Sequence, residues 1–99
     1  MAEYKLRLEV AAFAAMMEEE LRRKDALVET GEFRSWRDMT RAELHQRLRV
    51  QLAKLEIALD CGDSARVVLR CVHAANFLWM LVAKGWPEPT REARKEERP

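Results

Sequence analysis

Two pairs of polar side chains stand in otherwise apolar stretches of this chain. Gln51 and Lys54 form the first pair, and Arg70 and His73 form the second, each with a three-residue spacing. Residues three apart share one face of a helix, so each pair would present its two side chains together. Arg binds phosphate with two hydrogen bonds, and Lys attracts it as a point charge. The pattern therefore suits an anion, whereas Lys54 and Arg70 would repel a divalent metal ion.

A helix from Thr40 to about Asp60 is expected to position the first pair. Thr40 and Glu43 have the spacing of a capping box, in which each side chain bonds the other residue's backbone amide. Leucines recur at helical spacing after this box: Leu44, Leu48, Leu52, Leu55 and Leu59. Gln51 falls on the same side as this leucine stripe. An amide placed there needs a hydrogen-bond partner or a water-filled pocket.

The second pair belongs to a helix predicted from Asp63 to about Lys84. Gly62 permits the chain reversal before it, and Asp63 is a good N-cap. Apolar residues surround this helix on nearly every side, which is typical of a helix buried all round. So short a chain cannot cover it with two other helices. We therefore expect a second copy to complete the core, and a homodimer or higher oligomer to form.

The sequence before Thr40 predicts one more helix and a loop. A helix is expected from residue 4 to about 29, ending at Gly31, with a charged run over residues 18–25 assigned to a solvated face. The loop at 31–39 places Phe33 and Trp36 beside Arg34 and Arg37. Such aromatics either plug the end of a helical bundle or stack on a nucleobase, and both alternatives stay open.

These elements predict an all-α fold, an antiparallel bundle of three main helices over residues 1–86. Residues 87–99 are charged, lack apolar periodicity and are predicted to be a disordered tail. No secretory signal is visible, the longest apolar run is too short for a membrane span, and the two cysteines suggest no disulfide framework. A cytoplasmic protein without a membrane partner is expected.

Charge and motifs narrow the function further. Charged residues make up 35% of the chain, yet the formal net charge is only +1. This balance argues against a nucleic-acid-binding protein. The chain contains no glycine-rich phosphate loop and no arrangement of Ser, His and Asp or of Cys and His that would support nucleophilic catalysis. The sequence therefore gives no catalytic residue.

The stretch FRSWRDMTRAELHQRLRVQLAKLEIALDCGDSARVVLRCVHAANFLWML resembles the MazG-like all-α nucleoside triphosphate pyrophosphohydrolases, especially short phage and bacterial versions. Members of that family tend to carry E-x-x-E-L-x-x-A-L on one helix and E-x-x-D-V-A-N-F-x-M-M on the next. Here the first motif is matched from Gln51 to Leu59, and the second from Arg70 to Met80. In active members the four acidic residues bind magnesium, which holds the triphosphate and helps to activate water.

This sequence departs from the family at the four positions that bind magnesium in active members. The four acidic positions hold Gln51, Lys54, Arg70 and His73, so the resemblance does not carry over the magnesium site or hydrolysis. It implies a catalytically inactive member that binds a nucleotide or other phosphorylated small molecule without metal, with Asn76 and Trp36 at its base or sugar end. Three alternatives remain: a decayed pocket, a small helical module that binds a protein partner, and an active hydrolase with a relocated metal site.

Overall fold

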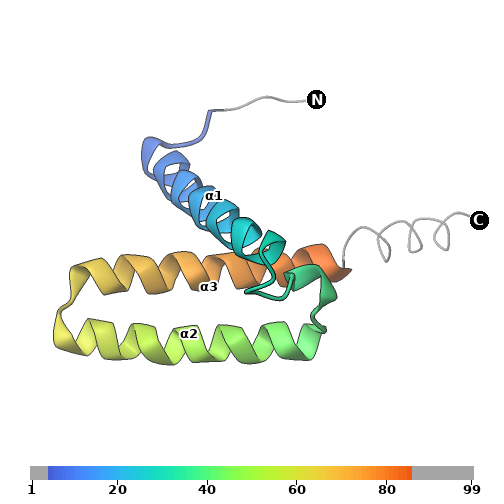
Figure 1. Cartoon of the computed structure of the whole chain (residues 1–99). Helices are drawn as coiled ribbons and strands as arrows, with labels where there is room; N and C mark the ends of the chain where they lie inside the picture. The colour runs from blue at the N-terminus through green and yellow to red at the C-terminus, as the bar shows by residue number, and fades with distance from the viewer. Residues whose placement is uncertain (1–4, 86–99) are drawn as a thin grey trace, which may run out of the picture.

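The computed structural model describes residues 5–85 and is helical, with no strand in that range. It contains α1 (Leu8–Glu29), a 3-10 turn η1 (Trp36–Asp38), α2 (Arg41–Cys61) and α3 (Ser64–Gly85), as Figure 1 shows. The all-α fold with three main helices is therefore confirmed for this part of the chain. Trp86 and the predicted tail at 87–99 lie outside the described residues.

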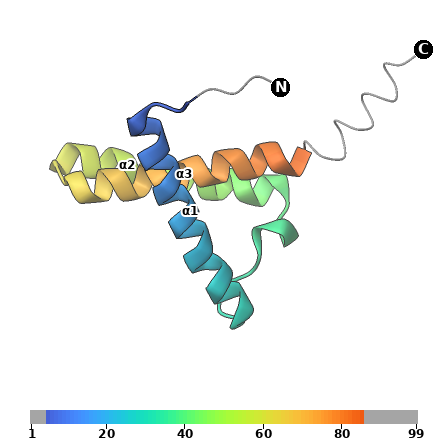
Figure 2. The ribbon, with the colours of Figure 1, turned by 90° about the horizontal axis from the view of Figure 1, so that it is seen from above.

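Helices α2 and α3 lie side by side and antiparallel (Figures 1 and 2). Gly62 ends α2 with a φ of +69°, a conformation that an L residue rarely adopts. The Asp63 carboxylate then accepts a hydrogen bond from the amide of Arg66 at 3.1 Å and caps α3. At the start of α2, Thr40 and Glu43 form both bonds of the predicted capping box. The sequence-predicted hairpin and its caps are thus confirmed.

The core lies between the two helices of this hairpin and the loop that leads into it. Leu44 is fully buried, and Leu48, Met39, Ala74, Phe77 and Met80 pack into one cluster with it. Fully burying one such large apolar side chain stabilises a fold by about 1.5–3 kcal/mol. The hairpin and the 3-10 turn therefore hold the chain together, and α1 adds to this core from one side.

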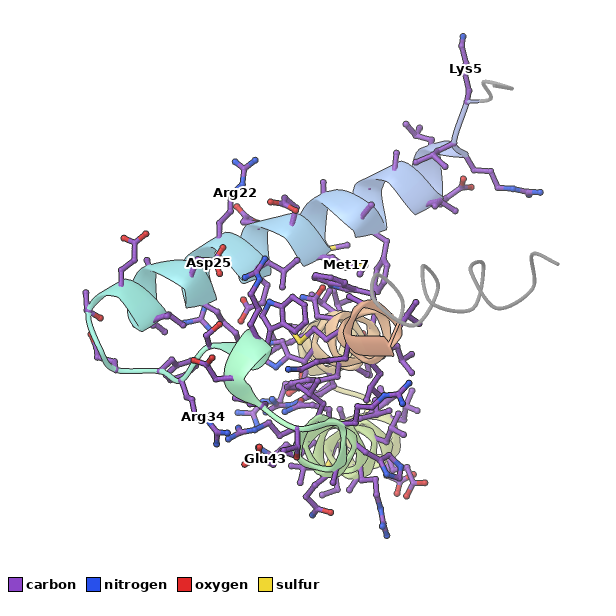
Figure 3. The ribbon with its side chains drawn as sticks, turned by 90° about the vertical axis from the view of Figure 1, so that its right-hand side faces the viewer. Lys5, Met17, Arg22, Asp25, Arg34 and Glu43 are labelled. Atoms are coloured by element: carbon purple, nitrogen blue, oxygen red, sulfur yellow. The ribbon has the colours of Figure 1, made fainter. Side chains whose placement is uncertain are left out.

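Helix α1 differs from its sequence prediction in two ways, its first residue and its direction relative to α3. It begins at Leu8 rather than at residue 4, and Arg7 provides no side-chain cap at that end. It also crosses α3 steeply (Figures 1 and 2) instead of lying antiparallel to it. In keeping with this crossing, α1 buries no residue completely. Met17 lies on its side facing α3, whereas Arg22 points away (Figure 3).

One face of the hairpin has no cover within residues 5–85. Leu52 and Leu59, both members of the predicted leucine stripe, are 45% and 58% exposed, and on α3 Leu78 and Val82 are 53% and 50% exposed. Helix α3 is also long and apolar enough, by length and composition, to cross a membrane. The central helix of a water-soluble bundle passes the same test, so this property does not decide between the two.

Candidate anion-binding groove

The hairpin brings the two predicted pairs together. Arg70 on α3 points its Nη1 at Oε1 of Gln51 on α2, at 3.4 Å, a long hydrogen bond. Lys54 follows Gln51 by almost one turn of α2, and His73 follows Arg70 in the same way on α3. All four side chains line one groove between the three helices, which we call the basic groove. The sequence-predicted grouping of these residues is confirmed by their positions.

The basic groove has a volume of about 370 Å³, within the range of small-molecule sites. Five of the residues that line it are cationic, and no carboxylate lines it among residues 5–85. The five are Arg23, Lys24, Arg47, Lys54 and Arg70. Such a surface raises the local concentration of anions, even though the whole chain is nearly neutral.

Glu20 of α1 lies behind this groove, beside His73. Its Oε2 is 3.1 Å from Nε2 of His73, and both side chains are almost buried, at 13% and 12% exposure. The direction between the two atoms does not meet the geometry of a regular hydrogen bond, and Nδ1 of His73 has no partner in the described residues. The contact is therefore electrostatic and depends on whether His73 carries a proton.

The charges around this contact shift several pKa values. The hydrogen bonds from Arg23, at 3.1 and 2.6 Å to the two carboxylate oxygens, hold the pKa of Glu20 below its usual value despite some burial. Burial lowers the pKa of His73, and the positive charges of Lys24 and Arg70 lower it further, against the opposing effect of Glu20. Imidazole is therefore biased toward its neutral form in the unliganded groove.

Lys24 stands at the junction of this groove with the loop. Its Nζ lies 5.3 Å from the centre of the Phe77 ring, a cation–π contact. Burial lowers its pKa, and the nearby guanidinium groups of Arg23 and Arg47 act in the same direction, while Glu20 opposes them. A cation held in this way, without an ion-pair partner in the described chain, is a favourable contact for a bound anion.

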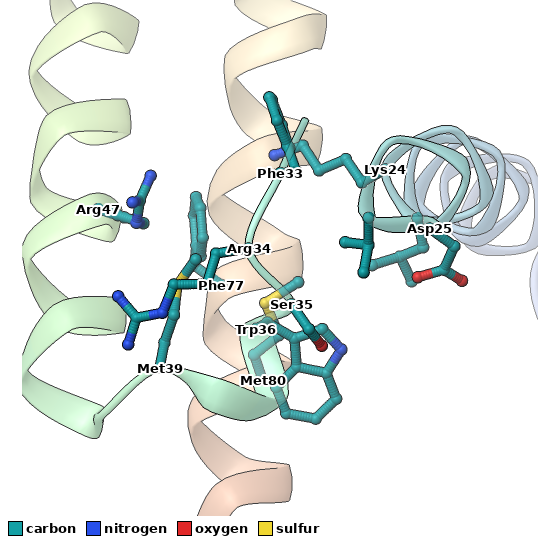
Figure 4. A pocket seen from close by; sticks show the side chains of 12 residues that line it. Lys24, Asp25, Phe33, Arg34, Ser35, Trp36, Met39, Arg47, Phe77 and Met80 are labelled. Carbon is teal, nitrogen blue, oxygen red and sulfur yellow. The ribbon is translucent and has the colours of Figure 1, made fainter. Parts of the chain in front are cut away.

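Trp36 lies in a different cavity from the four paired residues. This second cavity, the loop pocket, has a volume of about 60 Å³ and is lined by aromatic and aliphatic side chains with Arg34, Arg47 and Lys24 at its edge (Figure 4). The Trp36 ring packs edge-to-face against Trp79 at 5.1 Å, and the Arg37 guanidinium lies 4.9 Å from its centre. Trp36 thus packs against the core and also lines a pocket, while its stacking on a nucleobase stays a prediction.

Asn76 is not brought to either cavity. It is 4% exposed, and its Nδ2 donates to the carbonyl of Met17 at 3.3 Å. Its Oδ1 accepts from Nε1 of Trp79 at 3.1 Å. The first bond ties α3 to α1, the second lies within α3, and together they use the groups that were predicted to contact a nucleoside. The structure therefore gives Asn76 a structural contact and leaves its predicted ligand role without support.

The sequence interpretation missed three residues of α1 at this site. Glu20, Arg23 and Lys24 were assigned to a solvated run, yet Arg23 and Lys24 line the groove and Glu20 lies behind it, beside His73. A signal was present, because Glu20 and Lys24 continue the helical spacing of Phe13 and Met17 toward the same face. Four residues at that spacing lie on one face of α1. The charged residues in the second half of this face lie beside the cations and His73 of the hairpin.

The donor set in the groove does not suit a magnesium ion. Mg²⁺ prefers carboxylate and other hard oxygen ligands, whereas the groove offers two amides, Gln46 and Gln51, one imidazole and several cations. Across residues 5–85, no three His, Cys, Asp or Glu side chains come close enough to share a metal ion.

No protein-family model, curated protein or solved structure matches the chain.

Proposed function

We propose that this chain is a catalytically inactive MazG-like protein that binds a nucleotide or another phosphorylated small molecule without a metal ion. One observation carries the proposal. Lys24, Arg47, Lys54 and Arg70 converge on one groove, and none of them has a carboxylate ion-pair partner within residues 5–85. Cations gathered without counter-charges repel one another, so a bound phosphate would relieve this repulsion.

The proposed binding mode assigns the phosphates to the hairpin. Arg70 provides a planar, two-pronged donor, Lys54 an exposed point charge, and Gln51 an amide that could turn from Arg70 to a phosphate oxygen. His73 lines the same groove, and the negative charge of a bound anion would favour its protonated form. The ring of a nucleotide would lie toward the loop pocket, where Trp36 and Phe33 offer aromatic surface.

The loss of hydrolysis follows from the same residues. In the resembled family, metal-bound water attacks the phosphate, and the metal requires the four carboxylates. Replacing them with Gln51, Lys54, Arg70 and His73 removes the metal's ligands and leaves positive charge in its place. A phosphate could then contact the protein directly. Without the metal, the groove lacks the group that helps to activate water in the resembled family, and we expect the ligand to leave unchanged.

A nucleotide panel in EDTA tests this function. We expect nucleotides to raise the Tm by several degrees, because a ligand at 100 times its Kd stabilises the folded state by about 2.7 kcal/mol. Arg70→Gln should abolish the shift, while Arg49→Gln, which removes the same charge from the other side of α2, should retain it. A panel without any shift would rule the function out. Release of pyrophosphate with magnesium or manganese would favour the active hydrolase instead.

The exposed apolar face supports a second candidate, a small helical module that binds a protein. Leu52, Leu59, Leu78 and Val82 lie on the part of the hairpin that α1 does not cover. A second copy of the chain is the simplest occupant, and the proposed homodimer or higher oligomer would bury this face. An unrelated protein partner is the alternative. This face and the basic groove involve different residues, so the two candidates can be tested separately.

A further inference from the structure

The basic groove continues into a second cavity at each end. Toward the loop it shares Lys24, Phe33, Arg47 and Phe77 with the loop pocket. Toward the α2–α3 turn it shares Lys54 and Arg70 with a third cavity of about 240 Å³, which we call the turn cavity. The three cavities therefore adjoin one another along one side of the hairpin, and we call this row of cavities the channel.

This channel is longer than a mononucleotide requires. Arg47 and Cys61 mark two points on its α2 wall, and an α-helix rises by 1.5 Å per residue, so they are about 21 Å apart. Arg47 and Lys54 alone are about 10 Å apart by the same rule. The three adjoining phosphates of a nucleoside triphosphate would occupy one part of the channel and leave the turn cavity empty.

Cations recur along the whole channel, with apolar surface between them. Lys24 and Arg47 stand at the loop end, Lys54 and Arg70 in the middle, and Arg66 in the turn cavity, where it is paired with Asp63 at 3.4 Å. The apolar surface between these cations comes from Phe33, Phe77, Val50 and Ile57. Alternating positive charge and aromatic or apolar faces is the arrangement that tracks a single-stranded backbone while its bases stack.

We propose that the channel binds a short single-stranded oligonucleotide, with one base in or over the loop pocket. A stacked strand advances about 3.4 Å per nucleotide and an extended one roughly twice that, so about 21 Å holds roughly three to six nucleotides. The inference rests on the proposed function, because both use the same four cations. It goes further by naming a ligand with several phosphates in a row.

The near-neutral net charge does not oppose this inference, because the fold separates the charges. Two carboxylates line the channel: Asp25 in the loop pocket, and Asp63 in the turn cavity, where it lies 3.4 Å from Arg66. Outside the channel, Glu20 is held by Arg23 and Glu43 by Arg34. The unpaired cations therefore dominate the channel wall. The expectation from net charge considered only the sum over the chain, whereas a strand responds to the local field.

A length series of oligothymidylates in EDTA tests the inference. We expect the Kd to fall from dTMP to the hexamer and then to level off, because longer strands add no contact. With about four phosphates neutralised, log K should fall with log salt at a slope of about −3. If dTMP binds as tightly as the hexamer, the site is a mononucleotide site, and only the inference fails. If neither dTMP nor the hexamer nor any other nucleotide binds, the proposed function fails as well.

Further measurements distinguish a specific oligonucleotide site from a surface that attracts any polyanion. Arg66→Gln should weaken the hexamer severalfold and leave dTMP unchanged, while Arg49→Gln should alter neither. Phe33→Ala should weaken the hexamer roughly 5- to 150-fold, the usual effect of losing one stacked base. Circular dichroism checks that each variant keeps its helices. Equal affinity for the hexamer and for inorganic polyphosphate of the same charge, or an unchanged hexamer Kd in Phe33→Ala, would overturn the inference.

Discussion

His73 on α3 and Glu20 on α1 meet at 3.1 Å across the crossing of the two helices, with both side chains almost buried. Within residues 5–85, the contact joins α3, which holds part of the candidate site, to α1, which crosses it. Arg23 binds the same carboxylate from the outside, and Lys24 and Arg70 raise the positive charge around the imidazole. The stability of this crossing must therefore depend on pH.

The first prediction concerns that pH dependence. Burial lowers the pKa of His73 below the ordinary value of 6.5. The unfolded chain therefore binds more protons than the folded one as pH falls below about 6.5, and the free energy of unfolding decreases until the folded-state pKa is reached. We expect a lower Tm at pH 5.5 than at pH 7.5, with His73→Gln reducing the difference.

His45 provides the control for this measurement, because it lies exposed on α2. His45→Gln should keep the difference in Tm that His73→Gln reduces. The measurements must stay above pH 4.5, the ordinary pKa of a glutamate. The pKa of Glu20 is lowered in the folded chain, so the stability that its charge contributes is lost as the pH falls below 4.5. A Tm that rises on acidification to pH 5.5 would contradict the assignment of a neutral, buried His73.

The second prediction separates a structural role of Asn76 from a ligand role. Asn76→Ala removes the additional donor to the Met17 carbonyl and leaves the Trp79 indole N–H without its acceptor, both in a part-buried place. We expect a loss of about 1–3 kcal/mol in urea denaturation. At temperatures where the variant is folded, its nucleotide affinity should match that of the original chain. Normal stability with lost nucleotide binding would instead support the ligand contact predicted from the sequence.

Local signals in the sequence predicted the hairpin correctly, but they did not predict the angle at which α1 crosses α3. Thr40, Gly62 and Asp63 act through bonds within a few residues, so their types indicate where α2 begins and ends and where α3 begins. Two helical periods and one tight turn placed both polar pairs in the hairpin, whereas the contact between Gln51 and Arg70 was not predicted. Contacts of α1 depend on a crossing angle that no local pattern specifies, and for that reason Glu20 was missed.

The third prediction tests the start of α2. Thr40→Ala removes the hydroxyl that accepts from the amide of Glu43 at 3.0 Å, and loss of such a cap costs about 1 kcal/mol. The Glu43 carboxylate also accepts two hydrogen bonds from Arg34, and these bonds, with the Thr40 amide, lower its pKa to about 2. Thr40→Ser should preserve the cap. Equal urea midpoints for Ala and Ser would show that the box contributes nothing.

The last prediction concerns the apolar face that α1 leaves open. Leu59 and Leu78 are more than half exposed on neighbouring helices of the hairpin. Large exposed apolar patches on a folded chain mark interaction surfaces. We expect the original chain to sediment as a dimer or a higher oligomer at micromolar concentration. Leu59→Lys with Leu78→Lys should convert it to a monomer, because a lysine pair facing its symmetry copy would bury unpaired charge.

The matched control for that change is Leu8→Lys, which alters an exposed leucine at the far end of α1. It should leave the sedimentation coefficient unchanged. Because the basic groove and this face share no residue, the Leu59→Lys and Leu78→Lys variant should also keep its nucleotide affinity if one chain forms the whole groove. Loss of binding together with dissociation would show that the second copy completes the anion site. A monomeric original chain would leave this face open to a different protein partner.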